Sequence, residues 1–209
     1  MERQLYRKFR YQQYEKVYAR KRAELASKKE AILSKVADFR LSERVESKLL
    51  SLDATGIKQM LDQNEVTSEE LVRFYTKRTL TVGEKFNIAV DFMFDSAIAR
   101  AREIDLARTQ LSPEERARQP SLYGIPISIK DTFAIKGTDA TLGQGINCFK
   151  PAEKTGLAVR NLEEHGLIPF IKTNVPQSLL VNETNNYIFG RTRNPYNLER
   201  TSGGSLDAK

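Results

Sequence analysis

Apolar residues recur at helical spacing over the first forty positions of the chain. Residues 2–40 contain no glycine and no proline and are rich in residues with high helix propensity. A stripe with spacings of three, four and seven runs along their second half, formed by Leu25, Ile32, Leu33, Val36 and Phe39. Aromatic side chains precede it, namely Tyr6, Phe9, Tyr11, Tyr14 and Tyr18. Apolar positions with this period share one face of a helix, so the pattern predicts one long helix over residues 2–40.

Three shorter helices are predicted by the pattern that follows. Residues 42–50 and 55–63 have the pattern of short helices. Thr67 and Glu70 fit a capping box, in which a hydroxyl and a carboxylate each bond a free backbone N–H at a helix start. We therefore expect a third helix that begins at this box and ends near residue 78.

A strand and a helix are predicted next, followed by a loop. Residues 87–92 favour a strand, and Asp95 is expected to cap a helix that runs to residue 108. Three apolar residues of this helix have the spacing of an inward face: Ala97, Ala101 and Ile104. Residues 111–120 are polar and bounded by proline, which predicts a loop.

The second half of the chain has the pattern of a strand, a helix and another strand. Residues 123–131 alternate isoleucines with other residues and include Lys130, which is expected on the face opposite the isoleucines. Residues 155–165 predict a helix that Gly166 ends in the left-handed C-cap conformation. Residues 167–172 form a continuous apolar run, as in a buried strand. Strand, helix and strand in this order predict a right-handed crossover and an α/β fold.

The net charge of +7 belongs to the predicted N-terminal helix. Residues 1–40 hold 12 Lys/Arg against 5 Asp/Glu, whereas the other 169 residues hold 22 of each. A basic helix with an apolar stripe either docks on the rest of the chain or lies on an anionic membrane surface, and both interpretations stay open. No nucleic-acid-binding motif accompanies the charge, so no nucleic acid partner is expected. We expect a basic helical extension over residues 1–41 and an α/β domain over residues 42–209.

Composition excludes several kinds of site. The single cysteine, Cys148, excludes an internal disulfide. The single histidine, His165, excludes a histidine metal cluster and a Ser-His-Asp triad, and we expect no metal and no cofactor. The sequence shows neither an apolar run of spanning length nor a signal peptide, so we expect an intracellular protein, cytoplasmic or peripherally membrane-associated. A homo-oligomer stays open.

Two segments could carry chemistry, and each has a plainer alternative. Lys130 ends an apolar strand beside Asp131, where desolvation would lower the pKa of its amine and favour a neutral base. The alternative is a lysine that extends its charge into water from an edge strand. Residues 202–205, Ser-Gly-Gly-Ser, could place a hydroxyl or orient an oxyanion, or they could belong to a flexible tail.

Four ordered segments resemble those of the amidase signature family. They are GIPISIKDTFAIKGTDATLGQG (124–145), IKTNVPQS (171–178), FGRTRNPYN (189–197) and TSGGS (201–205). The similarity covers roughly residues 42–205. Within the family, the segments are most similar to those of the enzymes that hydrolyse fatty acid amides. The resemblance implies an incomplete amidase-like fold with a mixed sheet flanked by helices, behind a long basic N-terminal helix.

The Ser-cisSer-Lys arrangement of that family implies roles for two residues. Carried over by position, Lys130 would be the base, and Ser205 would be the intermediate serine, held by a cis peptide and shuttling the proton. The family motif continues with another serine and two glycines, whereas this chain has Leu-Asp-Ala-Lys at 206–209. We therefore expect the complete protein to hydrolyse a small-molecule amide, and this chain to lack the nucleophile segment and to be inactive alone. The alternative is a non-catalytic truncated isoform that binds a membrane surface or a protein.

Overall fold

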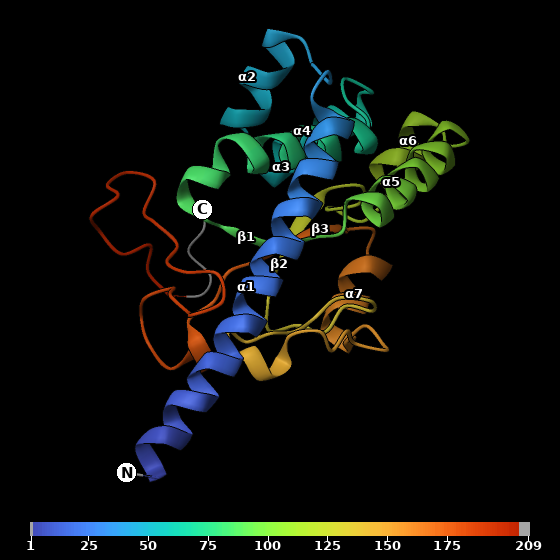
Figure 1. Cartoon of the computed structure of the whole chain (residues 1–209). Helices are drawn as coiled ribbons and strands as arrows, with labels where there is room; N and C mark the ends of the chain where they lie inside the picture. The colour runs from blue at the N-terminus through green and yellow to red at the C-terminus, as the bar shows by residue number, and fades with distance from the viewer. Residues whose placement is uncertain (1, 205–209) are drawn as a thin grey trace.

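The computed structural model describes the backbone of residues 2–204 and the side chains of residues 13–204. Within this range the helices are α1 (Glu2–Val36), α2 (Glu43–Ser51), α3 (Ala54–Asp62), α4 (Ser68–Thr81), α5 (Phe94–Thr109), α6 (Pro113–Ala117) and α7 (Leu157–Glu164). The strands are β1 (Ala89–Phe92), β2 (Pro126–Lys130) and β3 (Ile168–Thr173). Three 3₁₀ turns are η1 (Gly83–Phe86), η2 (Gly145–Asn147) and η3 (Gln177–Leu179). Figure 1 shows a small central sheet surrounded by the helices.

Polar side chains cap the N-termini of the first three helices after residue 41. Ser42 begins α2, and the Asp53 carboxylate begins α3 by accepting a hydrogen bond from the Gly56 N–H at 2.9 Å. Thr67 and Glu70 make the two reciprocal bonds of the predicted capping box, at 3.1 Å and 2.8 Å. The three predicted helices after residue 41 are therefore confirmed, with their starts satisfied as helix ends require.

Two local predictions were wrong. The N-cap of α5 is Met93, so Asp95 lies inside the first turn and not at the cap, where it pairs with Lys35 at 2.7 Å. A carboxylate in the first turn is still favoured by the helix dipole. Part of the predicted loop forms α6, because Ser112 begins a second capping box and the proline that follows occupies the first helical turn, where proline is tolerated.

The strands form a mixed sheet in the order β1-β3-β2. β2 and β3 are parallel neighbours joined through α7, and β1 pairs antiparallel with β3. Five of the six residues of β3 are buried, because the strand lies in the middle of the sheet under helices. This explains the continuous apolar run in its sequence. The α/β class and the mixed sheet are confirmed.

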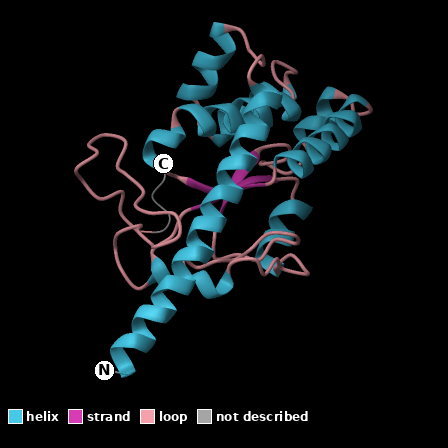
Figure 2. Cartoon of the chain, viewed as in Figure 1, coloured by secondary structure: helices cyan, strands magenta, loops and turns pink. Residues whose placement is uncertain are grey.

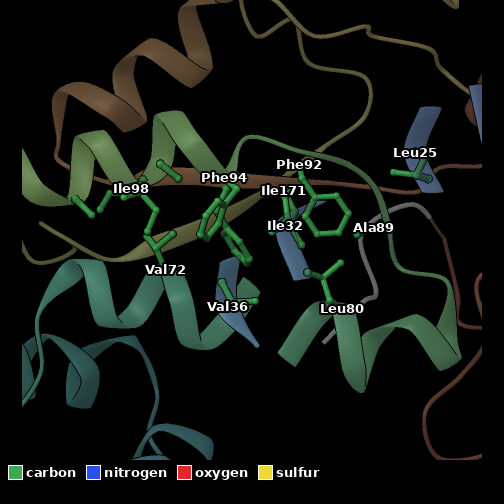
Figure 3. Packing of buried hydrophobic residues seen from close by; sticks show 14 of the residues in the cluster. Leu25, Ile32, Val36, Val72, Leu80, Ala89, Phe92, Phe94, Ile98 and Ile171 are labelled. Carbon is green, nitrogen blue, oxygen red and sulfur yellow. The ribbon is translucent and has the colours of Figure 1, made fainter. Parts of the chain in front are cut away.

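The main hydrophobic core lies between the sheet and three helices. One cluster of buried side chains joins α1, α4 and α5 to β1 and β3, and Figure 3 shows several of its members around Phe92 and Ile171. Phe92 is 1% exposed, and burial of such a side chain contributes about 1.5–3 kcal/mol. A second cluster lies under α2, α3 and α4, and in a third α7 packs near Ile129 of β2.

The apolar stripe of α1 faces the domain, along which the helix runs in Figure 1. Leu25, Ile32 and Val36 are at most 9% exposed and belong to the main core. Leu33 is 38% exposed, and Phe39 follows the end of the helix and packs on the second cluster. The stripe therefore docks α1 on the rest of the chain. No helix in the described range is long and apolar enough to cross a membrane.

Ion pairs reinforce the docking of α1. Four of its lysines pair with carboxylates of the domain at 2.6–2.9 Å: Lys21 with Asp139, Lys28 with Asp91, Lys29 with Glu84, and Lys35 with Asp95. The last three pairs are partly exposed, and such pairs contribute about 0–1 kcal/mol each. The first pair is buried on both sides. Part of the basic charge of α1 is thus neutralised within the chain.

The segment after β3 is almost entirely loop, as the long pink trace in Figure 2 shows. The turn η3 is the only regular element between residues 174 and 204. Buried backbone in such a loop needs partners other than a helix or a sheet. Asparagine and threonine side chains supply these partners. The same residues connect β3 to the glycine loop, residues 201–204.

Candidate active site

Lys130 is the last residue of β2 and lies opposite Thr173 of β3. The backbone around it is held on both sides: the Asp131 N–H donates to the Thr173 carbonyl at 3.1 Å, and the Phe133 N–H donates to the Lys130 carbonyl at 3.0 Å. The Lys130 side chain is half-buried and has no hydrogen bond or ion pair with any residue that the structure describes. An amine in this setting can exchange a proton with a hydroxyl brought next to it.

Asp131, the next residue, is buried and anchors the end of the strand. Its carboxylate accepts hydrogen bonds from the N–H and the hydroxyl of Thr141, and it lies 3.3 Å from Lys172 Nζ. Burial raises the pKa of the Asp131 carboxyl, although the charge of Lys172 and the bonds from Thr141 oppose this rise. Lys172 is 0% exposed and donates to the carbonyl of Asp139.

Asp139 joins the loop after β2 to α1. Its carboxylate accepts hydrogen bonds from the N–H groups of Phe149 and Lys150, both at 2.8 Å, and pairs with Lys21 of α1 at 2.9 Å. Burial lowers the pKa of the Lys21 amine, but the hydrogen bonds and charges of Asp139 and Glu24 outweigh it, so the net pKa is raised. Lys21 is therefore held in its charged form inside the protein.

Asn174 begins a polar network directly after the strand end that faces Lys130. Its Nδ2 donates to the Gly190 carbonyl and to the Thr192 hydroxyl, both at 3.0 Å. The Thr192 N–H in turn donates to the Thr184 carbonyl at 2.9 Å. The network therefore leads from the sheet into the loop segment after β3.

Asn186 closes this network with four hydrogen bonds. Its Nδ2 donates to Asn174 Oδ1 at 2.7 Å and to the Val175 carbonyl at 2.9 Å. Its Oδ1 accepts from the N–H groups of Ile188 at 3.0 Å and Phe189 at 2.8 Å. The side chain is 6% exposed, and a buried amide needs this full set of partners.

The network extends to the glycine loop at residues 201–204. The Thr184 hydroxyl donates to the Gly204 carbonyl at 3.0 Å, and the Gly203 N–H donates to Thr201 Oγ1 at 3.1 Å. Gly203 has a φ of 87°, a conformation that favours glycine. Ser202 is 8% exposed, and its hydroxyl has no partner among the described residues. Up to residue 204 the loop is thus docked on the folded chain.

The structure connects one of the two predicted catalytic positions to the motif that contains the other. Lys130 faces Thr173, and the polar network that starts at the next residue ends on Gly204. Ser205 lies outside the described residues, so its role as the intermediate serine stays a prediction. An acyl-transfer site needs a group that accepts a proton and a hydroxyl that is placed near it, and the predicted roles of Lys130 and Ser205 would supply these two parts.

The sequence has two other residues with reactive side chains, Cys148 and His165. Cys148 is buried, and desolvation raises the pKa of its thiol to about 11, which keeps it protonated and unreactive at neutral pH. His165 is the C-cap of α7, and its Nδ1 lies 2.7 Å from the carbonyl of Asn161. His165 therefore lies at the end of the helix that the sequence predicts over residues 155–165.

Sequence reasoning misses the polar residues that hold the site together. The signal for Lys172 is a lysine inside an otherwise apolar strand, which requires a buried partner. The signal for the network is the density of asparagine and threonine directly after that strand. The network residues that no pattern singled out are Asn174, Thr184, Asn186 and Thr192.

Comparison with known proteins identifies relatives of this chain. The protein-family model described as Amidase matches residues 70–205. A putative amidase, kk1C, from Curvularia clavata is 38% identical over 160 residues, which cover 77% of this chain and 29% of that protein. Fatty acid amide hydrolase 1 from Caenorhabditis elegans is 35% identical over 194 residues, which cover 90% of this chain and 32% of that protein. The chain therefore spans about 30% of the length of these relatives.

Solved structures share the fold at low sequence identity. A fatty acid amide hydrolase matches with a TM-score of 0.66 and 22% identity, over 91% of this chain and 38% of that chain. A bacterial aryl acylamidase matches with a TM-score of 0.67 and 24% identity, over 75% of this chain and 32% of that chain. The family model itself covers both the strand that ends in Lys130 and the glycine loop. The chain therefore belongs to the amidase signature family.

Proposed function

We propose that this chain forms the lysine-bearing part of an amidase that hydrolyses carboxylic amides. In this proposal the neutral amine of Lys130 accepts the proton of the Ser205 hydroxyl. Ser205 accepts the proton of a nucleophilic serine, which attacks the amide carbonyl and forms an acyl-enzyme. The proton passes to the departing amine, and water then hydrolyses the ester. The observation that supports this most is the half-buried Lys130, which has no partner among the described residues and ends a strand whose neighbour, β3, leads into the network that reaches the glycine loop.

We infer that the 209-residue chain does not complete this machinery alone. It spans about 30% of the length of its curated relatives. In the family motif that residues 201–205 resemble, the next residues are a serine and two glycines. Residues 206–209 of this chain are Leu-Asp-Ala-Lys. Without the nucleophile no acyl-enzyme can form, so we expect no turnover by this chain.

The substrate class that we propose is a fatty acid amide or a related carboxylic amide. Similarity to Fatty acid amide hydrolase 1 extends over 90% of this chain, whereas similarity to the putative amidase kk1C extends over 77%. The longer match is the support for the fatty acid amide class over other amides.

Incubation of the purified 209-residue protein with a long-chain primary amide tests the inference of inactivity. We expect no release of ammonia above the rate without protein. Hydrolysis by this protein that disappears in the Lys130→Ala variant would show that the chain is an active amidase by itself.

A chimera tests the role of Lys130. Residues 1–205 would replace the matching N-terminal region of the nematode Fatty acid amide hydrolase 1, and hydrolysis of a long-chain amide would be measured. We expect Lys130→Ala to lower kcat by at least about a hundredfold, as loss of a general base does. The matched control is Lys136→Ala, which changes an exposed lysine of the following loop. Equal activity of the two variants would remove Lys130 from the mechanism.

The alternative function, a non-catalytic module that binds an anionic membrane or a protein through residues 1–41, stays a prediction. Four lysines of α1 already pair with carboxylates of the chain, so attraction to lipid would depend on exposed residues such as Lys16. Sedimentation with anionic vesicles tests it, because electrostatic binding falls as salt is added. Equal binding to neutral vesicles at high salt would contradict an electrostatic attachment.

A further inference from the structure

A row of four buried charges connects α1 to the strand end that carries Lys130. We call it the buried charge row; its members in order are Lys21, Asp139, Lys172 and Asp131, with side chains 7%, 5%, 0% and 2% exposed. Lys21 Nζ lies 2.9 Å from the Asp139 carboxylate, and Lys172 Nζ donates to the Asp139 carbonyl. Lys172 Nζ also lies 3.3 Å from the Asp131 carboxylate. The row holds two cations and two anions, so the loss of any one of these charges leaves a net charge in it.

The buried charge row also holds backbone segments in place through hydrogen bonds. Asp139 accepts hydrogen bonds from the N–H groups of Phe149 and Lys150, which ties the far end of the loop after β2 to the row. Asp131 directly follows Lys130, and its N–H bonds to the carbonyl of Thr173 in β3. A shift at the Asp139 end is therefore transmitted to the backbone beside Lys130 through rigid, buried contacts.

A buried ion pair is weak evidence for a purely stabilising role, because apolar residues of similar volume often stabilise a core as well. Here the row ends at Asp131, which directly follows Lys130 in the chain, and the amine of Lys130 has no partner in the described range. Any uncompensated charge in the row would act on that amine through a medium of low dielectric constant. The other groups near Lys21 are Glu24, at 3.0 Å, and the thiol of Cys148.

We propose that Lys21 of α1 is a positioning residue for Lys130, acting through Asp139, Lys172 and Asp131. The proposal rests on the proposed role of Lys130 as a base, and it makes α1 a part of the active site, in addition to its place in the core. Loss of the Lys21 charge leaves an excess negative charge in the row, which favours the protonated form of a nearby amine. Loss of the Asp139 charge leaves an excess positive charge, which favours the neutral form.

Competitive acylation of the lysines of the 209-residue protein tests this, with the extent of modification of Lys130 measured by mass spectrometry as a function of pH. We expect Lys21→Met to move the midpoint of the Lys130 profile upward by about half a pH unit or more, and Asp139→Asn to move it downward. At a fixed pH on the rising part of the profile this is about a threefold change in rate, in opposite directions. Lys21→Arg, which keeps the charge, is expected to keep the original midpoint.

The matched control is Lys29→Met, which removes another ion pair of α1 whose carboxylate partner, on Glu84, is 53% exposed. It should leave the Lys130 profile unchanged. Far-UV circular dichroism and urea denaturation identify any variant that fails to fold, and Lys21→Arg and Asp139→Asn keep the test decisive in that case. A common shift of the Lys21→Met and Asp139→Asn profiles in one direction, or no shift, would overturn the proposal. Since no hydrolysis is measured, this result is independent of the chimera assay.

Discussion

Replacement of Asn186 by alanine probes the polar network that carries the glycine loop. The change removes four hydrogen bonds, at 2.7, 2.9, 3.0 and 2.8 Å, from a side chain that is 6% exposed. At about 1 kcal/mol of net stabilisation each, the bonds contribute about 4 kcal/mol, and water that enters the vacated space recovers part of it. We expect the free energy of unfolding to fall by about 2–4 kcal/mol.

Urea denaturation followed by circular dichroism measures this loss, and amide hydrogen exchange locates it. Protection should fall most over residues 174–204 in Asn186→Ala, and in α4 by no more than the loss of global stability, because the network stabilises the loop segment directly. The control is Asn185→Ala, an adjacent asparagine with an exposed side chain. The reasoning is wrong if Asn186→Ala and Asn185→Ala have the same unfolding free energy and the same exchange pattern.

Two further predictions concern the loops around the sheet. The pKa of the Cys148 thiol is about 11, so a disulfide reagent at pH 8 should label the native protein at least about a hundredfold more slowly than the urea-unfolded protein. Equal labelling rates would contradict the burial of the thiol. Gly137 and Gly166 both have positive φ, at 81° and 83°, but a Cβ at Gly166 would lie 2.1 Å from the Tyr123 ring, whereas one at Gly137 meets nothing within 4 Å. Gly137→Ala should therefore lower the unfolding free energy by about 1–2 kcal/mol. Gly166→Ala should lower it by about 1–3 kcal/mol more, because the new methyl group also clashes with the ring. Urea denaturation of the two variants checks the difference, and similar midpoints would show that the ring moves away freely.

Local signals in the sequence predict most of the elements. The capping box at Thr67 depends on residues three positions apart, and the apolar run of β3 depends on burial alone. Both can be recognised without knowing the rest of the fold. The position of Lys130 at a strand end could be predicted for the same reason. The short helix α6 was missed because it buries no residue, so no apolar stripe indicates it.

The partners of the buried polar residues could not be predicted, because tertiary packing decides which lysine meets which carboxylate. Lys172 bonds Asp139, 33 positions earlier in the chain, and Lys21 pairs with the same residue from the first helix. The sequence contains 27 acidic residues, and nothing in its local pattern selects Asp139 among them. The same holds for Asn174 and Thr192, whose roles depend on the path of a loop.

The long helix α1 also has a consequence for how the chain folds. Arg22 donates hydrogen bonds to the carbonyls of Tyr187 and Ile188, which lie 165 and 166 positions later in the chain. A ribosome therefore releases α1 well before the residues that cover it exist. Contacts so distant in sequence slow folding, and until β3 is made the apolar stripe of α1 lacks part of its core and is open to wrong partners. Helix α1 is therefore synthesised before its partners in the chain, and the contacts of Arg22 are among the last native contacts that it can form.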